Sequence, residues 1–234
     1  MKDIINQWNH AASKYTEDQE RSDLVKSNKE AVMSRFTHFS GEKILDMGCG
    51  YGFYTDYFRS IGADVIGIDG SEQMIHIAQK RYPLTSFSIM DITTPLSFQN
   101  DQFDIVFSNQ VLMDIKDIDF IFSEVSRILK TGGIFYYSIV HPAFYDCHWL
   151  EDENGYKYAK AMDKYIKPYQ FTNLFWGETE HFHRSLSYYL NEAAKYGLAL
   201  KQACEPVTYD GINKNSDLPL FFIAEYINLP HSPL

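Results

Sequence analysis

Three glycines at alternate positions, Gly48, Gly50 and Gly52, follow a largely apolar run at residues 44–47 and precede a helical pattern. A chain that leaves a buried strand by a sharp turn needs glycine where its backbone approaches a ligand, because side chains would obstruct the contact. The next apolar run, residues 65–68, ends in Asp69, 19 residues beyond Gly50. A carboxylate at that strand end can accept hydrogen bonds from both hydroxyls of a ribose. This spacing predicts a nucleotide-binding cradle.

Two other interpretations fit single parts of this pattern. Dinucleotide-binding dehydrogenases also combine glycines with an acidic residue after the second strand, but their glycines follow the order Gly-x-Gly-x-x-Gly. Here the three glycines alternate, which favours a different cofactor. A purely structural turn is the remaining alternative, and Asp69 and Asp91 could each be a strand-end or helix-capping acid.

The elements that must position these residues alternate along the chain. The pattern predicts strands at 43–48, 64–69, 86–90, 103–108 and 133–140, with helices at 53–61, 72–82 and 117–130. The sequence Thr131-Gly132-Gly133 should stop the third of these helices. Two further strands, near 198–206 and 220–227, should pair as an antiparallel edge. We therefore expect a Rossmann-like, doubly wound α/β fold of three layers, α/β/α, whose mostly parallel sheet has an antiparallel last strand.

The 234 residues suffice for one domain around one core. Its expected parts are an N-terminal helical segment (1–40), a cofactor-binding core (41–140), a cap insertion (141–181) and a C-terminal helix with a strand pair (182–234). The cap segment shows no sustained period but is rich in aromatic residues, which disordered linkers lack. We expect it to cover the carboxyl ends of the strands, where open α/β sheets bind ligands.

The first segment carries apolar residues at helical spacing, and we interpret this face as a packing surface. Its residues are Ile4, Ile5, Trp8, Ala11, Ala12 and Tyr15.

The composition of the chain limits which classes of molecule it binds and in which cellular compartment it acts. The net charge of −10, from 21 basic and 31 acidic residues, disfavours a nucleic-acid substrate. The three cysteines are an odd number without metal-ligand spacing, which suits free thiols in a reducing compartment. No apolar run approaches the ~20 residues that span a bilayer, and no signal-peptide pattern is present. We expect a cytoplasmic protein that acts on a small molecule, without a membrane partner; the sequence indicates no oligomeric state.

Four motifs in order resemble the class I S-adenosylmethionine-dependent methyltransferases of the small-molecule, methyltransferase-11/25-like type. They lie at residues 45–52, 67–74, 90–92 and 103–109, the last continued at 129–133, and together they fall within 43–140. The resemblance implies transfer of a methyl group from S-adenosylmethionine to a small-molecule acceptor by in-line displacement, which leaves S-adenosylhomocysteine.

The resemblance also implies which residues hold the cofactor. By this resemblance, Asp69 binds the ribose hydroxyls, Asp91 accepts from the adenine amino group, and Asp46 supports the methionine ammonium. Ile92 and Met74 would sandwich the adenine ring. The other expected contacts are Gly48, Cys49, Gly50, Gly52, Gly70, Tyr15 and, at the methionine end, Asn109 and Gln110.

The catalytic assignment rests on fewer signals. Met113 and Asp114 stand where many members of the family carry histidines, so no base carries over from the resemblance. If the acceptor is a hydroxyl, His141, His181 and His183 are the candidate bases. Their spacing predicts no metal site. A structural role for His141 and a solvated helix start at 181–184 are the alternatives.

Two other functions share the predicted cofactor site. One is a methyltransferase that modifies tRNA or protein. The other is a non-catalytic S-adenosylmethionine-binding sensor or accessory protein.

Overall fold

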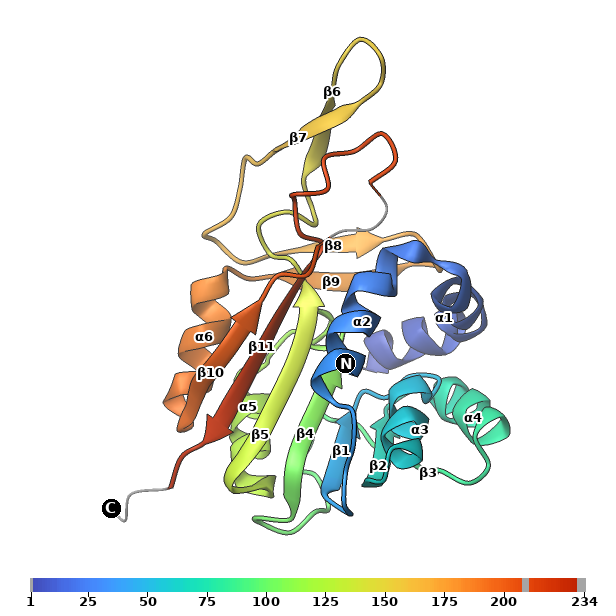
Figure 1. Ribbon diagram of the computed structural model, residues 1–234, viewed down its shortest axis with the longest axis vertical. Helices are drawn as coiled ribbons and strands as arrows, with labels where there is room; N and C mark the ends of the chain where they lie inside the picture. Colours follow the sequence, from blue (N-terminus) through green and yellow to red (C-terminus); the bar gives the residue numbers. More distant parts are fainter. Residues whose placement is uncertain (1, 208–210, 231–234) are drawn as a thin grey trace.

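Figure 1 shows the computed structural model of the protein, which describes residues 2–207 and 211–230. Seven strands form one sheet in the order β10-β11-β5-β4-β1-β2-β3. Its parallel strands are β1 (Lys43–Met47), β2 (Asp64–Asp69), β3 (Ser86–Ile89), β4 (Phe103–Asn109) and β5 (Leu129–Val140). Next to β5, β11 (Phe221–Asn228) runs antiparallel to both β5 and the edge strand β10 (Leu198–Cys204). The predicted Rossmann-like sheet with an antiparallel last strand is confirmed.

Helices pack on both faces of this sheet, because neighbouring residues of each strand point to opposite sides. On one face, α2 (Lys26–Arg35) and α3 (Phe53–Ser60) bury Ile44 and Phe107 of the strands. On the other face, α5 (Asp119–Ile128) and α6 (Leu186–Lys195) bury Leu45 and Val106. Phe107 stacks on Tyr136 of β5 with ring centroids 5.4 Å apart. The result is the expected three-layer arrangement.

The boundary between α5 and β5 differs from the prediction. The helix ends at Ile128 and β5 begins at Leu129, so Thr131-Gly132-Gly133 lies inside the strand and does not follow the helix. Leu129 is fully buried, has an extended backbone and pairs with Phe103 of β4. This pairing with a distant strand ends the helix. The residues near Leu129 in the sequence do not indicate the pairing, so the helix end could not be predicted from them. The register between the two strands then shifts before Ile105.

Two hairpins occupy the segment in which the sequence showed no period. They are β6 (His148–Glu151) with β7 (Lys157–Ala161), and β8 (Tyr169–Asn173) with β9 (Thr179–His183). The β8–β9 hairpin lies across the carboxyl ends of the sheet strands, while β6–β7 projects away from the sheet (Figure 1). Each strand is short, which explains why the sequence pattern did not predict them.

The N-terminal segment places α1 (Lys2–Arg21) beside this end of the sheet. The side-chain carbonyl of Gln7 accepts a hydrogen bond from the N–H of Glu180 at 3.0 Å, which joins α1 to β9. Asn9 of α1 accepts a hydrogen bond from the Ser71 hydroxyl at the start of α4 (Glu72–Arg81) at 2.7 Å. The helix therefore bridges the β8–β9 hairpin and the sheet core. Across residues 2–207 and 211–230, no helix is long and apolar enough to cross a membrane.

Candidate functional site

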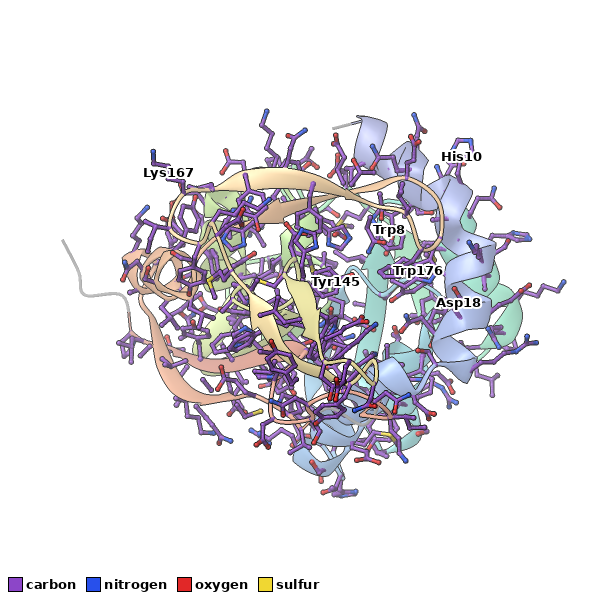
Figure 2. All side chains as sticks on the ribbon, turned by 90° about the horizontal axis from the view of Figure 1, so that it is seen from above. Trp8, His10, Asp18, Tyr145, Lys167 and Trp176 are labelled. Carbon is purple, nitrogen blue, oxygen red and sulfur yellow. The ribbon has the colours of Figure 1, made fainter. Side chains whose placement is uncertain are left out.

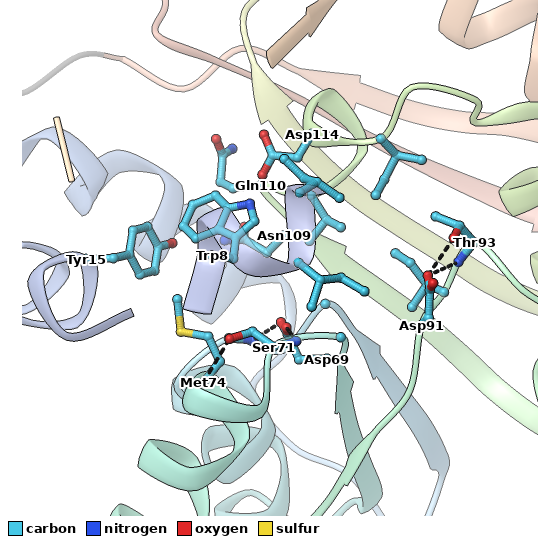
Figure 3. Close-up of a pocket in the computed structure, with 18 residues that line it drawn as sticks. Trp8, Tyr15, Asp69, Ser71, Met74, Asp91, Thr93, Asn109, Gln110 and Asp114 are labelled. Carbon is cyan, nitrogen blue, oxygen red and sulfur yellow. Dashed lines mark hydrogen bonds between the residues drawn. The ribbon is translucent and has the colours of Figure 1, made fainter. Parts of the chain in front are cut away.

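A pocket of about 730 Å³, including its open mouth, lies at the carboxyl ends of β1, β2, β3 and β4 beside α1 (Figure 3). Loops that follow the four strands supply most of its walls, and α1 supplies the rest. The lining residues are Ile4, Ile5, Trp8, Tyr15, Gly48, Gly50, Asp69, Gly70, Ser71, Met74, Asp91, Ile92, Thr93, Asn109, Gln110, Val111, Asp114 and Ile115.

The glycine turn after β1 has the backbone that the sequence pattern predicted. Gly48, Gly50 and Gly52 have φ angles of +78°, +54° and +85°, which only glycine adopts without strain. A Cβ on Gly48 would lie 2.4 Å from a methyl carbon of Val111. The missing side chain therefore lets the loop after β4 close on the loop after β1. Gly48 and Gly50 line the pocket, whereas Gly52 begins α3 behind it.

Asp69 connects this turn to the end of β2. One carboxylate oxygen accepts the N–H of Gly50 at 2.9 Å, and the other accepts the N–H of Ser71 at 2.8 Å. Burial raises the pKa of Asp69, while these two hydrogen bonds favour its charged form. Because each carboxylate oxygen can accept more than one hydrogen bond, Asp69 has capacity left for a ligand. Gly70, the next residue, also lines the pocket.

Asp91 holds the loop after β3 in a similar way. Its Oδ1 accepts the backbone N–H of Thr93 at 2.9 Å and the Thr93 hydroxyl at 2.5 Å (Figure 3). Ile92 and Met74, both buried, form apolar walls of the same pocket. The structure thus brings together, at neighbouring strand ends, the acidic and apolar residues that the sequence assigned to the adenosine part of the ligand.

Asp46 and Cys49 lie behind the pocket wall, outside the set of residues that line it. Asp46 is 2% exposed and accepts a hydrogen bond from the Thr55 hydroxyl at 2.6 Å. Burial raises the pKa of this carboxyl to about 7, although the hydrogen bond from Thr55 opposes the shift. Burial also raises the pKa of the Cys49 thiol, so the thiol is neutral.

Asn109 and Gln110 lie where β4 ends, as the sequence predicted, and both line the pocket. The Asn109 side-chain oxygen accepts a hydrogen bond from Asn28 of α2 at 2.7 Å. Gln110 has a φ of +59°, and its amide donates to the Ser138 hydroxyl at 2.6 Å. These bonds hold the two side chains at the junction of the sheet and the N-terminal segment.

The N-terminal helix contributes more to the pocket than the sequence indicated. Tyr15 was expected there, but Ile4, Ile5 and Trp8 were interpreted as packing residues only. The rings of Trp8 and Tyr15 lie 5.2 Å apart, and Trp176 of the β8–β9 loop approaches Tyr15 to 4.8 Å. Figure 2 shows Trp176 beside Trp8. The helical spacing of these apolar residues predicts that one face of the helix is covered. It does not show whether other protein residues or a ligand cover that face.

None of the three candidate histidines lines this pocket. His141 accepts the N–H of Ala143 through Nδ1 at 3.1 Å and donates from Nε2 to Glu205 at 2.7 Å, so both of its nitrogens are engaged. His183 donates to the Tyr165 carbonyl at 2.7 Å. These contacts favour structural roles for His141 and His183.

His181 occupies a different environment. It lies on β9, is 2% exposed, and places Nε2 3.5 Å from Oδ1 of Asp114, a pocket residue. The alternative of a solvated helix start is wrong, because His181, His183 and Arg184 are buried and α6 begins at Leu186 with Ser185 as its cap. In the part of the chain that the structure describes, no three His, Cys, Asp or Glu residues are grouped as a metal site would require.

Comparisons with known proteins agree with this geometry. Residues 45–137 match the family model of a methyltransferase domain. A structure described as an S-adenosylmethionine-dependent methyltransferase from Listeria monocytogenes superposes with a TM-score of 0.76 at 25% identity, over 87% of this chain and 98% of that one.

Two curated relatives are O-methyltransferases by name. The ubiquinone biosynthesis O-methyltransferase of Bartonella quintana is 26% identical over 58% of this chain and 59% of its own length. The malonyl-[acyl-carrier protein] O-methyltransferase of Erwinia billingiae is 28% identical over 56% of this chain and 50% of its own length. The chain thus spans between half and three fifths of these relatives.

The sheet order, the glycine turn and the match over residues 45–137 identify a methyltransferase domain in this chain, with the fold of the Listeria monocytogenes structure.

Proposed function

We propose that this protein transfers the methyl group of S-adenosylmethionine to an oxygen atom of a small-molecule acceptor. One observation carries the proposal: a single pocket combines the glycine turn, Asp69 and Asp91 at successive strand ends. The names of the two curated relatives, both O-methyltransferases, support oxygen as the accepting atom.

The pocket residues fit this cofactor in shape and charge. Asp69 would hold the ribose hydroxyls, and Asp91 would accept from the adenine amino group between Ile92 and Met74. Three carboxylates line the pocket, and the described lining residues include no lysine or arginine. Since the sulfonium and ammonium groups outnumber the single carboxylate of the cofactor, a pocket of negative charge favours it.

The cofactor supplies a methyl group that is already activated by the positive sulfur. The protein's own residues then have to orient and shield the reacting atoms. The strand-end loops would hold the acceptor in line with the transferring methyl group. This orientation is the largest contribution to the reaction rate that we expect from the protein. We propose that α1 and the cap segment, residues 141–181, exclude water above the pocket in this protein. In this proposal, the cofactor lies on the core, residues 41–140. The N-terminal segment (1–40) and the cap (141–181) cover it, and residues 182–234 complete the domain.

An acceptor of small size agrees with the confined pocket beside α1 and the β8–β9 hairpin. We place the reaction in the cytoplasm, which the three free cysteines support.

Calorimetry with S-adenosylmethionine and the variant Asp69→Asn tests the cofactor site. Because Asn retains only one accepting oxygen for two backbone N–H groups and the ribose, we expect an affinity loss of about 10- to 100-fold. Asp64→Asn, an exposed position at the other end of β2, is the matched control and should bind as the wild type does. Equal affinity of Asp69→Asn and Asp64→Asn would contradict the assignment.

Incubation of a metabolite extract with methyl-labelled S-adenosylmethionine tests the reaction. We expect label in a small, extractable compound. Label in bulk RNA or protein would instead favour a macromolecular substrate, and cofactor binding without any labelled product would favour a sensor or accessory protein.

A further inference from the structure

Asp114 is a buried carboxylate to which the proposed cofactor contacts assign no role. It ends the 3-10 turn η2 (Leu112–Asp114), is 5% exposed, and lines the pocket. Its Oδ1 has no hydrogen-bond partner among the described residues. Figure 3 shows the carboxylate on the pocket wall, directed toward the side of Trp8 and Gln110. A buried polar atom without a partner costs stability, so a ligand that donates a hydrogen bond is the expected partner.

Three elements that are distant in sequence position this carboxylate. Trp8 of α1 faces Asp114, and its indole lowers the pKa of this carboxylate, in opposition to burial. Arg184, which follows β9, donates to the carbonyls of Ile115 at 2.5 Å and Lys116 at 2.7 Å, just after the turn. Arg184 is 4% exposed, so this clamp belongs to the interior. The position of Asp114 is therefore built by the fold and does not depend on a mobile surface loop.

His181 faces Asp114 across the interior. Its Nε2 lies 3.5 Å from Oδ1 of Asp114 without the geometry of a hydrogen bond, and it accepts a hydrogen bond from the Asn173 side-chain amide at 3.5 Å. Within the described ranges, the His181 Nδ1 has no partner. Burial lowers the pKa of His181 to about 4, so the imidazole is neutral and does not cancel the charge of the carboxylate. Burial raises the pKa of Asp114 well above its usual range, with a smaller contribution from Asp69. A raised pKa makes a carboxylate a stronger base.

The charge of the pocket restricts the acceptor that can lie against Asp114. Asp69, Asp91 and Asp114 face the same space, and no lysine or arginine appears among its described lining residues. An anionic acceptor such as a carboxylate or a phosphate ester would meet like charge in a partly desolvated site. A neutral hydroxyl can donate its hydrogen to the unpaired oxygen.

Building on the proposed function, we propose that Asp114 binds the accepting hydroxyl of an uncharged acceptor and takes up its proton, while Arg184 holds the turn that carries this carboxylate. The acceptor O–H bond and the sulfur–carbon bond break, and an O–C bond and an O–H bond on Asp114 form. The positive charge on sulfur and the negative charge on the carboxylate disappear together, so charge balances without another reactant.

The test compares Asp114→Asn with Asp117→Asn, an exposed carboxylate three residues further along the same loop. Labelled product from the metabolite extract and the calorimetric affinity for S-adenosylmethionine are measured for both variants. Loss of a general base should lower the rate of labelling by about 100-fold or more in Asp114→Asn. Affinity for the cofactor should fall by no more than about 10-fold, because the variant removes one of three carboxylates of the pocket, and Asp117→Asn should match the wild type in both measurements. Asp114→Glu, which keeps a carboxylate, should recover part of the rate.

A pH profile separates a proton acceptor from a residue that only shapes the pocket. The wild-type rate should rise with pH as Asp114 ionises, and Asp114→Asn should lose this dependence. The other titratable or charged groups that face Asp114 from the elements around it are Asp69, Tyr15, Tyr145, His181, Arg184 and Tyr189. All of these remain in the variant, so a change in the profile reports on Asp114 itself.

Three results would overturn the proposal: a labelling rate of Asp114→Asn close to that of the wild type, an unchanged pH profile, or a parallel loss of cofactor affinity. The last would assign Asp114 to the cofactor. If the wild type binds S-adenosylmethionine but labels nothing, the proposed function itself fails, which is a distinct outcome.

Discussion

Asp46 couples the stability of the fold to the charge beside the glycine turn. The carboxyl is 2% exposed, and its burial raises the pKa to about 7. Since this pKa lies above the ordinary value of 3.8, folding favours the protonated form. The associated stability is fully present below about pH 4 and is lost as the pH rises toward 7. At neutral pH the Asp46 carboxyl is thus partly ionised, and its charged form costs stability behind the wall of the pocket.

Asp46→Asn removes this cost. At pH 8 we expect the variant to be more stable by up to about 4 kcal/mol, because an amide does not ionise. It should also bind S-adenosylmethionine about 10-fold more weakly, because a negative charge near a cationic ligand is lost. Between pH 6 and 8 the wild-type affinity should rise relative to that of the variant. Urea unfolding and calorimetry at both pH values measure these effects; a variant that is less stable and equally tight in binding would refute the explanation.

At the scale of elements, α1 and the β8–β9 hairpin meet through aromatic rings above the pocket. Trp176 of the hairpin loop contacts Tyr15 at 4.8 Å and Trp8 at 6.2 Å between ring centroids (Figure 2). Both partners line the pocket. Aromatic pairs of this kind contribute about 0.5–1.5 kcal/mol each. The contact joins two segments that are otherwise linked by few polar interactions, so it should govern how long a ligand stays enclosed.

Trp176→Ala should therefore raise the dissociation rate of S-adenosylmethionine by about 10-fold, since two aromatic contacts are lost. Because the same two contacts also stabilise the fold, the free energy of unfolding should fall by about 1–3 kcal/mol at most. Stopped-flow fluorescence measures the rate. Leu174→Ala, at a position that is 71% exposed in the same loop, is the control. An unchanged dissociation rate in Trp176→Ala would show that the rings do not enclose the ligand.

Across the whole molecule, Glu225 joins the N-terminal segment to the last strands. Arg35 of α2 donates to both oxygens of the Glu225 carboxylate, at 2.6 and 2.9 Å, and Lys201 of β10 donates at 2.7 Å. Glu225 is 3% exposed. Burial alone would raise the pKa of Glu225, but the hydrogen bonds from Arg35 and Lys201 outweigh it and lower the pKa. The ion pairs thus contribute stability above the ordinary pKa of about 4.5 that is lost as the pH falls through the lowered value.

Glu225→Gln leaves two cations without a partner. Because Arg35 and Lys201 are more than a third exposed, we expect a moderate loss of about 1–2 kcal/mol in the free energy of unfolding at pH 7. The difference from the wild type should shrink toward pH 3 as the wild-type carboxyl becomes protonated. Denaturant unfolding at the two pH values checks both parts. Glu30→Gln, an exposed acid on α2, should show no such loss, and a pH-independent difference for Glu225→Gln would rule out the electrostatic account.

Local pattern predicted much of the fold, because strand and helix periodicity is carried by neighbouring residues. The prediction failed where pairing between distant segments determines the secondary structure. Leu129, for example, belongs to β5 because it pairs with Phe103. It also failed in the β6–β7 and β8–β9 hairpins, whose short strands are stabilised by each other.

The sequence by itself predicted the pocket residues that we assign to the cofactor. Gly48, Asp69 and Asp91 each follow a parallel strand, and the carboxyl ends of neighbouring parallel strands meet at one edge of the sheet. Only the tertiary structure decided which side chains gather around Asp114. Trp8, Asp114 and His181 come from three distant segments, and their protonation and hydrogen bonds depend on burial and on neighbours brought together by folding. Residue type and spacing encode a turn that cradles a ligand, whereas the desolvation of a carboxylate exists only after the chain has packed around it.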